Sequence, residues 1–355
     1  MRRSPTLLVT GGAGYIGSHV VAQLGARKEH IVVLDNLSTG NQRAVLHGRL
    51  VVGDIGNQDL LRSLFRDYRI ETVLHFAARI VVPESVAKPL DYYDCNTARA
   101  RVLLAEAHRA GVEQFIFSST AAVYGDPVGG LARETSRTDP LSPYGRSKLM
   151  TEWMLRDLCA ASSMRHVILR YFNVAGCDSL GRLGQDTPEA THLIKVACEH
   201  AVGLRPQLEI FGTDYPTQDG TCVRDYIHVE DLAMAHLNAL DYLRAGGEGL
   251  TANCGYGHGF SVREVLEALE RIHGHALNIR ESGRREGDMA SIVANSELIR
   301  ERLSWLPTRD NLELILKSAL AWERKRLARA QRHLGLVAFE GATVVRRGSR
   351  PGPYP

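Results

Sequence analysis

Gly11, Gly14 and Gly17 follow directly on the short apolar run Leu7–Thr10 and open a predicted helix over 15–26. This G-x-x-G-x-x-G spacing permits a tight turn, a close approach of backbone to a pyrophosphate, and close contact between helix and strand. The amino end of the helix offers free N–H groups and partial positive charge to a phosphate. A plain strand-to-helix turn has the same outline, so the meaning of the motif depends on the rest of the chain.

The first half of the chain alternates apolar runs with helical stretches. Further strands are predicted at 31–35, 50–54, 72–76, 114–119 and 167–172, and helices at 58–67, 90–110 and 144–160. The runs are continuously apolar instead of alternating with polar residues, which is typical of a parallel sheet buried on both faces. We therefore expect an α/β fold with a Rossmann-type, doubly wound parallel sheet.

This rhythm changes after residue 172. Segments 174–188 and 210–224 are predicted loops, and helices are predicted at 230–244, 261–273 and 311–331. The sequence thus predicts a nucleotide-binding domain over 1–172 and a smaller α/β substrate-binding domain over 173–330, partly interleaved with the first. Residues 331–355 are a predicted flexible basic tail, because segment 324–355 holds eight Arg and Lys against the single acid Glu340. A polyanion or partner contact of this tail stays open.

Composition excludes several other classes of protein. The 355 residues are 44% hydrophobic and 23% charged, which argues against disorder, and a net charge of +3 argues against nucleic acid as a partner. No apolar run reaches the roughly 18 residues of a membrane helix, and Leu7-Leu8-Val9 is too short for a secretion signal. The six cysteines form no C-x-x-C pair, so we expect no structural zinc, no disulfides and a cytoplasmic location.

Two strand-end acids bear on the choice of cofactor. Asp35 ends the second predicted strand, where a carboxylate can accept from both ribose hydroxyls of NAD and repel the extra phosphate of NADP. NAD is therefore the predicted cofactor; a helix cap or turn is the alternative role for Asp35. Asp54, at the end of the third strand, either accepts from the adenine amine or closes a turn.

Tyr144 and Lys148 carry the candidate chemistry. Their i, i+4 spacing places them one turn apart on one face of a predicted helix. A free phenol, with a pKa of about 10, is a poor base, but a nearby ammonium and a positive nicotinamide ring are expected to lower that pKa. Thr120, after the strand ending Ser118-Ser119, can bond both a substrate hydroxyl and the Tyr144 oxygen. A cap role for Thr120 stays open.

With these features in hand, the chain resembles the extended short-chain dehydrogenase/reductases and, closely, the UDP-glucose (UDP-galactose) 4-epimerase family. The resemblance runs from about 6 to 325 and reaches the sugar-nucleotide side of the fold. It rests on 9–19 (VTGGAGYIGSH), 34–38 (LDNLS), 75–78 (HFAA), 142–148 (SPYGRSK), 170–173 (RYFN), 211–217 (FGTDYPT), 223–229 (VRDYIHV) and 284–288 (RREGD).

The resemblance implies a role for each matched residue. Tyr144 would be the catalytic base, Lys148 would hold the nicotinamide ribose, and Thr120 would share the proton network. The cofactor would contact Gly11, Gly14, Tyr15, Ile16, Gly17, Asp35, Asn36, Leu37, Ser38, Asp54, Ile55, Phe76, Ala77, Ala78, Tyr144, Lys148 and Phe172. The UDP-sugar would contact Thr120, Tyr144, Asn173, His192, Leu193, Ile210, Phe211, Arg224, Arg285 and Asp288, with the two arginines clamping the diphosphate. Considered without the motifs around them, Arg224 and Arg285 would more often form surface ion pairs.

Some positions depart from the family pattern or leave its details open. Ala121 and Ala122 stand where water-eliminating relatives carry acids, which favours simple epimerisation. Cys95 replaces a familiar Asn and is given no cofactor contact. His192 either binds pyrophosphate or packs in its loop. Ile292 leaves open whether UDP-hexoses, UDP-N-acetylhexosamines or UDP-pentoses are the substrates.

The sequence also leaves one alternative function open, and the resemblance implies an oligomeric state. A non-catalytic NAD-sensing regulator is the alternative from another class of protein. The resemblance also implies a homodimer formed through a helix bundle.

Overall fold

The computed structural model describes residues 5–188, 190–285 and 287–345, with side chains up to residue 332. Its centre is a seven-stranded sheet in the order β12-β7-β5-β4-β1-β2-β3, in which every pair is parallel. The strands are β1 (Thr6–Thr10), β2 (Ile31–Asp35), β3 (Arg49–Val52), β4 (Ile70–His75), β5 (Gln114–Thr120), β7 (Arg165–Tyr171) and β12 (Leu250–Cys254). The predicted Rossmann-type α/β fold is confirmed.

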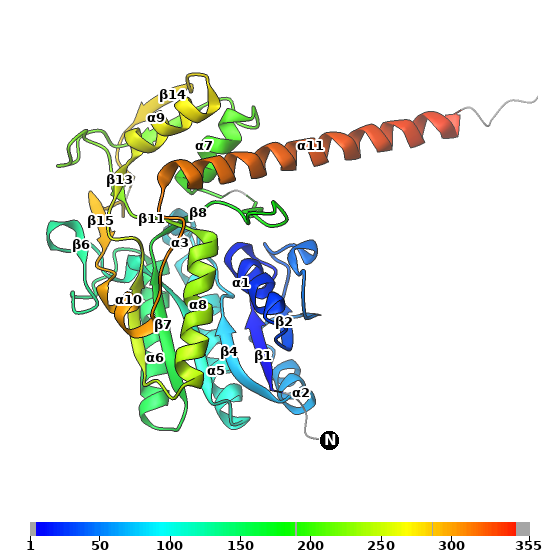
Figure 1. Cartoon of the computed structure of the whole chain (residues 1–355), viewed down its shortest axis with the longest axis vertical. Helices are drawn as coiled ribbons and strands as arrows, with labels where there is room; N and C mark the ends of the chain where they lie inside the picture. Colours follow the sequence, from blue (N-terminus) through cyan, green and yellow to red (C-terminus); the bar gives the residue numbers. More distant parts are fainter. Residues whose placement is uncertain (1–4, 189, 286, 346–355) are drawn as a thin grey trace, which may run out of the picture.

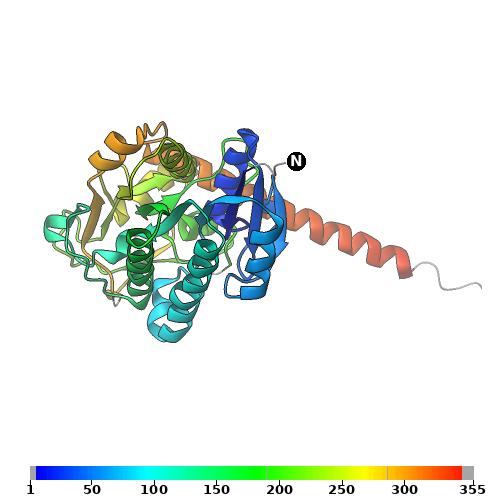
Figure 2. The ribbon, with the colours of Figure 1, turned by 90° about the horizontal axis from the view of Figure 1, so that it is seen from below.

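Helices cover both faces of this sheet (Figure 1, Figure 2). On one face lie α1 (Tyr15–Ala26) and α8 (Val229–Arg244), and on the other α2 (Gln58–Asp67), α5 (Arg99–Arg109) and α6 (Pro143–Ala160). Successive strand residues point to opposite faces, so Leu7 and Val9 pack in the first layer while Leu8 packs in the second. Both layers are apolar, which explains the continuously apolar strands.

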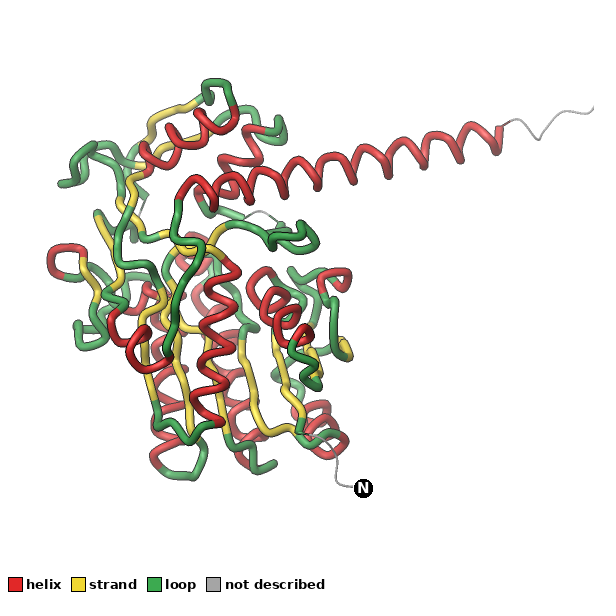
Figure 3. The backbone as a smooth tube through the Cα atoms, viewed as in Figure 1, coloured by secondary structure: helices red, strands yellow, loops and turns green. Residues whose placement is uncertain are grey.

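The second half of the chain forms smaller sheets above the carboxyl ends of the main strands (Figure 3). One sheet has the order β13-β10-β15-β6, and two are strand pairs, β11 with β8 and β14 with β9. These strands are β6 (Leu131–Ala132), β8 (Asn173–Ala175), β9 (Leu208–Phe211), β10 (Val223–Arg224), β11 (Tyr226–His228), β13 (Phe260–Ser261), β14 (Ile279–Ser282) and β15 (Ser291–Ala294). The helices are α7 (Leu193–Ala201), α9 (Val262–His273), α10 (Glu297–Leu303) and α11 (Leu312–Val345).

The two halves exchange elements. Strand β6, from the first half, pairs with β15, whereas β12 and α8, from the second half, complete the main sheet and its helical layer. The division of the chain at residue 172 into two domains stays a prediction. The expected loops at 174–188 and 210–224 in fact contain the short strands β8, β9 and β10.

Two predicted helices differ from the structure. The stretch 90–110 is divided into α4 (Pro89–Tyr93), a π-helical turn (Asp94–Ala98) and α5, and it follows a further short helix, α3 (Val82–Ala87). The tail from 331 is helical as far as Val345, because α11 continues to that residue and projects from the body of the molecule (Figure 1, Figure 2). No proline interrupts this stretch. The flexibility of the tail stays a prediction. Arg346, Arg347 and Arg350 of the predicted tail lie outside the described residues.

None of the helices in the described ranges is long and apolar enough to cross a membrane.

Candidate active site

The glycine-rich turn brings three segments of backbone into close contact. Gly11 has a φ of 71°, and a Cβ on it would lie 2.5 Å from Ala77 N. A Cβ on Gly17 would lie 2.3 Å from Gly11 O. Glycine is therefore required at both positions, and the turn lies against the predicted cofactor segment Phe76, Ala77 and Ala78.

The first turn of α1 is open to an anion. Gly14 is the N-cap residue of α1 and has no capping side chain, so the N–H groups of Tyr15, Ile16 and Gly17 have no partner within the helix. The first turn contains no acidic residue that would compete with a phosphate. The Tyr15 hydroxyl donates to Gly176 O at 2.6 Å and so ties the turn to the second half of the chain.

Asp35 is buried between the turn and the following loop. Its carboxylate accepts from Ala13 N at 2.9 Å and from Leu37 N at 2.8 Å. The second bond is the turn role held open above, and each oxygen keeps a lone pair for a further donor. The side-chain amide oxygen of Asn36 accepts from Ser38 N at 3.0 Å. The loop that would surround an adenosine ribose is thus ordered by its own hydrogen bonds.

Asp54 is held by several partners. Its carboxylate accepts from Gly56 N, from Asn36 at 3.0 Å and from Arg99 at 2.7 Å. Although burial raises the pKa of Asp54, the hydrogen bonds and the Arg99 charge together lower it. Asp54 therefore closes a turn and forms an ion pair, which is the alternative that the sequence left open. The neighbouring Ile55 is buried in the sheet core.

Tyr144 lies in the first turn of α6. The Ser142 side chain caps this helix by accepting from Gly145 N at 3.2 Å, and Pro143 occupies its first position. The Thr120 hydroxyl at the end of β5 lies near the phenol of Tyr144 and acts to lower its pKa, so the helix start and the strand end meet at these two side chains. Thr120 also accepts from Ala122 N at 3.1 Å, so it caps the turn after β5 as well.

Lys148 is buried one turn further along α6. Its ammonium donates to Ser118 O at 2.8 Å and lies 5.0 Å from the centre of the Phe117 ring. Burial lowers the pKa of Lys148 to about 8, and the nearby Cys95 and Glu152 oppose this shift. Cys95 is therefore close enough to act on the charge of Lys148, and the prediction that it makes no cofactor contact is left as it stands.

The expected lowering of the Tyr144 pKa is wrong for the chain alone. Burial raises the pKa of Tyr144, and the nearby Thr120 hydroxyl only partly offsets the rise. The expectation assumed that the Lys148 ammonium would face the phenol, whereas it is bonded to the Ser118 carbonyl. Two causes of a lowered Tyr144 pKa were predicted, the Lys148 ammonium and a positive nicotinamide ring. Only the nicotinamide ring could still lower that pKa, once the cofactor is bound.

A buried ionic network, not foreseen from the sequence, fixes α6 against the strands. Glu152 accepts from Ser119 on β5 at 2.5 Å and from Arg170 on β7 at 2.9 and 2.6 Å. Glu152 lies one turn beyond Lys148, so these bonds set the position of both catalytic candidates. The signal was present: an arginine inside the apolar run 167–172 needs a buried acid.

The π-helical turn holds the other side of α6. Buried Asn96 donates to Arg79 O at 3.0 Å and to the Ser147 hydroxyl at 3.1 Å, and it accepts from Arg79 N at 2.8 Å. Thr97 also donates to Ser147 O at 3.1 Å. π-helical turns inside α-helices are frequent at functional sites, and this one holds Ser147, the residue directly before Lys148.

Three predicted substrate residues form a cluster in the second half of the chain. The Arg285 guanidinium bonds Asp288 at 2.9 Å and lies 4.5 Å from the centre of the Phe211 ring. The preceding residue on β9, Ile210, is different, because its side chain is only 1% exposed and packs in the main core. A uracil contact at Ile210 is therefore restricted to the backbone.

Arg224 lies on β10 opposite Ile292 of β15. Among the described residues, no carboxylate lies within ion-pair distance of its guanidinium, which donates to Val223 O at 2.9 Å. Ile292 is buried with Phe172, Ala121 and Leu149 of α6. Arg224 therefore lies next to Ile292, and Ile292 belongs to the cluster that packs on α6, the helix of Tyr144.

The remaining predicted contacts lie at the edges of this region. Asn173 opens β8 and donates its N–H to Asp225 O at 2.9 Å. His192 precedes α7 and is bonded to Gln185 at 3.0 Å, while burial lowers its pKa, so the neutral ring is favoured. Leu193 packs against the main core. His192 is therefore packed in its loop, and its second ring nitrogen is still available.

These residues fit a bound NAD. The open first turn of α1, the backbone cradle at Gly11 and Gly17, the carboxylate of Asp35 and the buried ammonium of Lys148 supply donors and acceptors of the required kinds.

Comparison with known proteins agrees with this geometry. The sequence matches the NAD dependent epimerase/dehydratase family over residues 7–255. The chain belongs to this family. It is 56% identical to a UDP-glucose 4-epimerase of Azospirillum brasilense, over 90% of this chain and 92% of that protein.

Two solved structures are similar in fold and sequence. A UDP-glucose 4-epimerase from Bifidobacterium longum, in complex with NAD+ and UDP, has a TM-score of 0.86 and 37% identity over 90% of this chain and 98% of its own. A UDP-Glc/GlcNAc 4-epimerase from Campylobacter jejuni has a TM-score of 0.80 and 46% identity over 91% of this chain and 100% of its own. The predicted family, NAD cofactor and sugar-nucleotide 4-epimerase activity are confirmed. The chain is thus an enzyme, which decides against the non-catalytic regulator.

Proposed function

We propose that the chain interconverts UDP-galactose and UDP-glucose, with Tyr144 as the base that removes the proton of the sugar C4 hydroxyl. One observation carries this assignment: the Tyr144 phenol, at the start of α6, lies beside Thr120 at the end of β5, with the Lys148 ammonium buried one turn away. Phenol, hydroxyl and ammonium are thus gathered at the carboxyl ends of the strands, where doubly wound sheets bind their ligands.

The reaction is redox-neutral. A bound NAD would supply hydride-acceptor and hydride-donor chemistry at C4, so that the transient 4-keto sugar can be reduced again on its opposite face without an outside reductant. Tyr144 accepts the hydroxyl proton and gives it back, while Thr120 hydrogen-bonds the phenol and the sugar oxygen. Lys148 orients the nicotinamide ribose and places a positive charge in the site. Since burial raises the pKa of Tyr144, we expect the phenol to become an effective base only when the site is loaded.

The second half of the chain would hold the nucleotide. Arg224 and Arg285 are placed to clamp the diphosphate, Asp288 to accept from the uridine ribose, and Phe211 to pack on the uracil. Arg285 reaches a phosphate only by sharing or releasing its bond to Asp288. A firm hold on UDP and few contacts to the hexose would allow the keto sugar to turn over within the site.

The test is conversion of UDP-galactose by the purified protein without added NAD, with UDP-N-acetylgalactosamine and UDP-arabinose in parallel. We expect the hexose to be converted and NAD to remain bound. Ile292 is 2% exposed and packs on Phe172, so it offers no small-residue opening for an N-acetyl group. Faster turnover of either alternative substrate than of UDP-galactose would overturn the choice of hexose.

We also propose a homodimer. Helices α3, α4 and α6 pack together and expose Val86, Leu90, Met150 and Trp153, whose exposed fractions are 42%, 78%, 36% and 50%. Exposed apolar side chains on neighbouring helices are typical of an interface. Sedimentation equilibrium of the wild type and of Trp153→Glu should give a dimer and a weakened dimer; a monomeric wild type would refute this.

We place the enzyme in the cytoplasm. All six cysteines are free, and four of them are buried, which suits a reducing compartment.

A further inference from the structure

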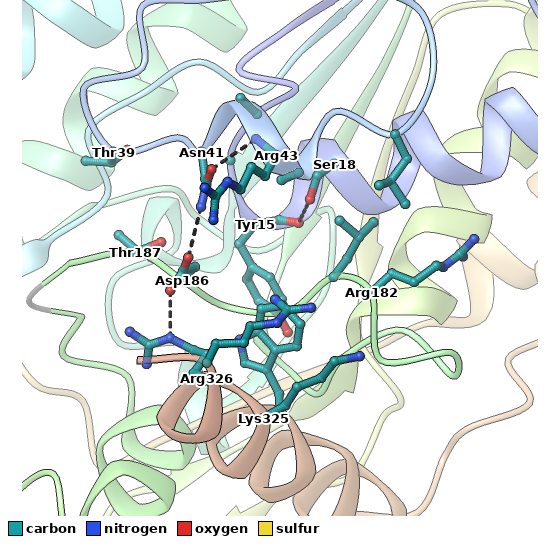
Figure 4. A pocket seen from close by; sticks show the side chains of 18 of the residues that line it. Tyr15, Ser18, Thr39, Asn41, Arg43, Arg182, Asp186, Thr187, Lys325 and Arg326 are labelled. Atoms are coloured by element: carbon teal, nitrogen blue, oxygen red, sulfur yellow. Dashed lines mark hydrogen bonds and ion pairs between the residues drawn. The ribbon is translucent and has the colours of Figure 1, made fainter. Parts of the chain in front are cut away.

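A groove of about 760 Å³ lies beside the cofactor turn and outside the catalytic residues (Figure 4). Its walls are the start of α1, the segment after β2, the segment before α7, and the middle of α11. It includes Gly14 and Tyr15 of the turn but not Thr120, Tyr144 or Lys148. The groove thus shares its edge at Gly14 and Tyr15 with the cofactor turn, whereas the proposed epimerase reaction gives no role to its other lining residues.

The groove is strongly basic. Among the described residues, its lining contains five cations and one acid, Asp186; the cations are Arg43, Arg182, Lys325, Arg326 and Arg329. Arg182 pairs with Asp178 at 2.8 Å, and Arg326 pairs with Asp186 at 2.6 Å and with Glu323 at 2.5 Å.

Three of these cations have no acidic partner among the residues that the structure describes. Lys325 donates to Gly181 O at 2.6 Å, and the Arg329 guanidinium lies 5.6 Å from the centre of the Trp322 ring. The Arg43 side chain extends from the opposite wall (Figure 4). For Arg43, Lys325 and Arg329, no carboxylate of the described residues lies within ion-pair distance. Three such cations around one cavity favour a ligand with several negative charges.

Part of the remaining lining is apolar. Ala44, Leu46, Leu204, Trp322 and Leu327 line the groove together with the basic side chains and a few neutral polar ones. A cavity of this volume suits a small organic molecule, and its lining combines an apolar wall with a few directed charges. Inorganic phosphate would satisfy only the charges, whereas a nucleoside polyphosphate has both a flat ring and a chain of charges.

The two walls are held at a fixed separation by hydrogen bonds. Asn41 donates its N–H to Ala13 O at 2.9 Å and its side chain to Asp186 at 3.2 Å, and Asp186 in turn binds Arg326 of α11. The groove is therefore formed before any ligand arrives. The chain's own terminal segment does not suit it, because Arg346, Arg347 and Arg350 would meet like charges.

We propose that this groove is a second nucleotide site, which binds a nucleoside polyphosphate separately from the catalytic cleft. The phosphates lie among Arg43, Lys325 and Arg329, and the nucleoside lies on the apolar wall.

The test is calorimetric titration of the NAD-containing enzyme with ATP while excess UDP fills the substrate cleft. Retained NAD is checked by absorbance before and after the titration. We expect one ATP per chain, bound more tightly than inorganic triphosphate or adenosine. No binding, or displacement of NAD, would overturn the proposal. Equal affinity for triphosphate would reduce the site to a plain anion site, and tighter binding of a single-stranded oligonucleotide would make it a nucleic-acid surface; both results contradict the proposal.

Matched variants test the location. Lys325→Gln with Arg329→Gln removes two charges from the groove, and Arg324→Gln with Arg332→Gln removes two exposed charges from the same helix outside it. We expect the first pair to weaken ATP binding by about tenfold or more and the second to change it less than twofold, on the order of charge-assisted contacts. Arg43→Gln, on the other wall, should also weaken binding. Equal losses in both pairs, or no loss in Arg43→Gln, would place the ligand elsewhere.

Discussion

Substitution Glu152→Gln tests whether the buried network holds the catalytic helix in place. Glu152 is 0% exposed and Arg170 is 2% exposed, and two hydrogen bonds of 2.9 and 2.6 Å join them. Glutamine keeps the shape but removes the charge, which leaves a buried guanidinium without a counter-charge. Loss of one partner from such a pair costs about 3–5 kcal/mol, and since the amide oxygen retains one acceptor we expect about 3 kcal/mol.

The assay is urea denaturation of the NAD-containing enzyme, with Glu313→Gln as the control. Glu313 pairs with Lys317 at 3.1 Å, but the two side chains are 56% and 61% exposed, so its loss should cost less than about 0.5 kcal/mol. We also expect a lower kcat in Glu152→Gln, because Ser119 and the Tyr144 helix lose their common anchor. A cost within about 1 kcal/mol of the control would refute the reasoning.

Three further perturbations follow from the same structure. Gly11→Ala should abolish NAD retention during purification, because the new Cβ would lie 2.5 Å from Ala77 N. Gly111→Ala is the control, since Gly111 also has a positive φ, 74°, but no atom lies within 4 Å of the Cβ position. An equal loss of NAD in the control would contradict the steric explanation. Burial lowers the pKa of His236 to about 4. As the pH falls, His236 is therefore protonated in the unfolded chain before it is protonated in the folded one. The contribution of the neutral ring to folding stability is complete above pH 6.5 and is lost as the pH falls towards 4. The free energy of unfolding of the wild type relative to His236→Gln should therefore drop by about 3 kcal/mol over that range in urea titrations; a constant difference would count against this. Asp35→Ala should lower the ratio of bound NAD to NADP, and an unchanged ratio would remove its cofactor role.

The sheet and its helices were predictable because each depends on local pattern. Continuously apolar runs mark strands that are buried on both faces, and the helices 15–26 and 58–67 have the bounds that their sequences predict. Strand β12 was missed because Leu250–Cys254 is short, mixes polar with apolar residues and pairs with a strand distant in sequence, β7. The π-helical turn was missed for a similar reason, because Asn96 acquires its partners only when α6 packs against it.

The candidate site was likewise predictable where it depends on the local sequence and not where it depends on tertiary packing. The glycine spacing and the Tyr144–Lys148 spacing are local, and the structure places Thr120 beside Tyr144. The direction of the Tyr144 pKa shift depends on burial and on where the Lys148 ammonium points, which spacing alone does not determine. The basic groove requires α1 and α11 to form walls of the same cavity, although nearly three hundred residues separate them in the chain.

Turnover of UDP-galactose by Tyr144→Phe, in protein that still carries its NAD, measures the central claim most directly. Phenylalanine keeps the ring that packs edge-on to Tyr92 at 6.4 Å and removes only the phenol oxygen, which lies near Thr120. We predict a loss in kcat of about 10²–10⁴-fold with NAD content unchanged. A kcat within tenfold of the wild type would contradict the assignment of Tyr144 as the base.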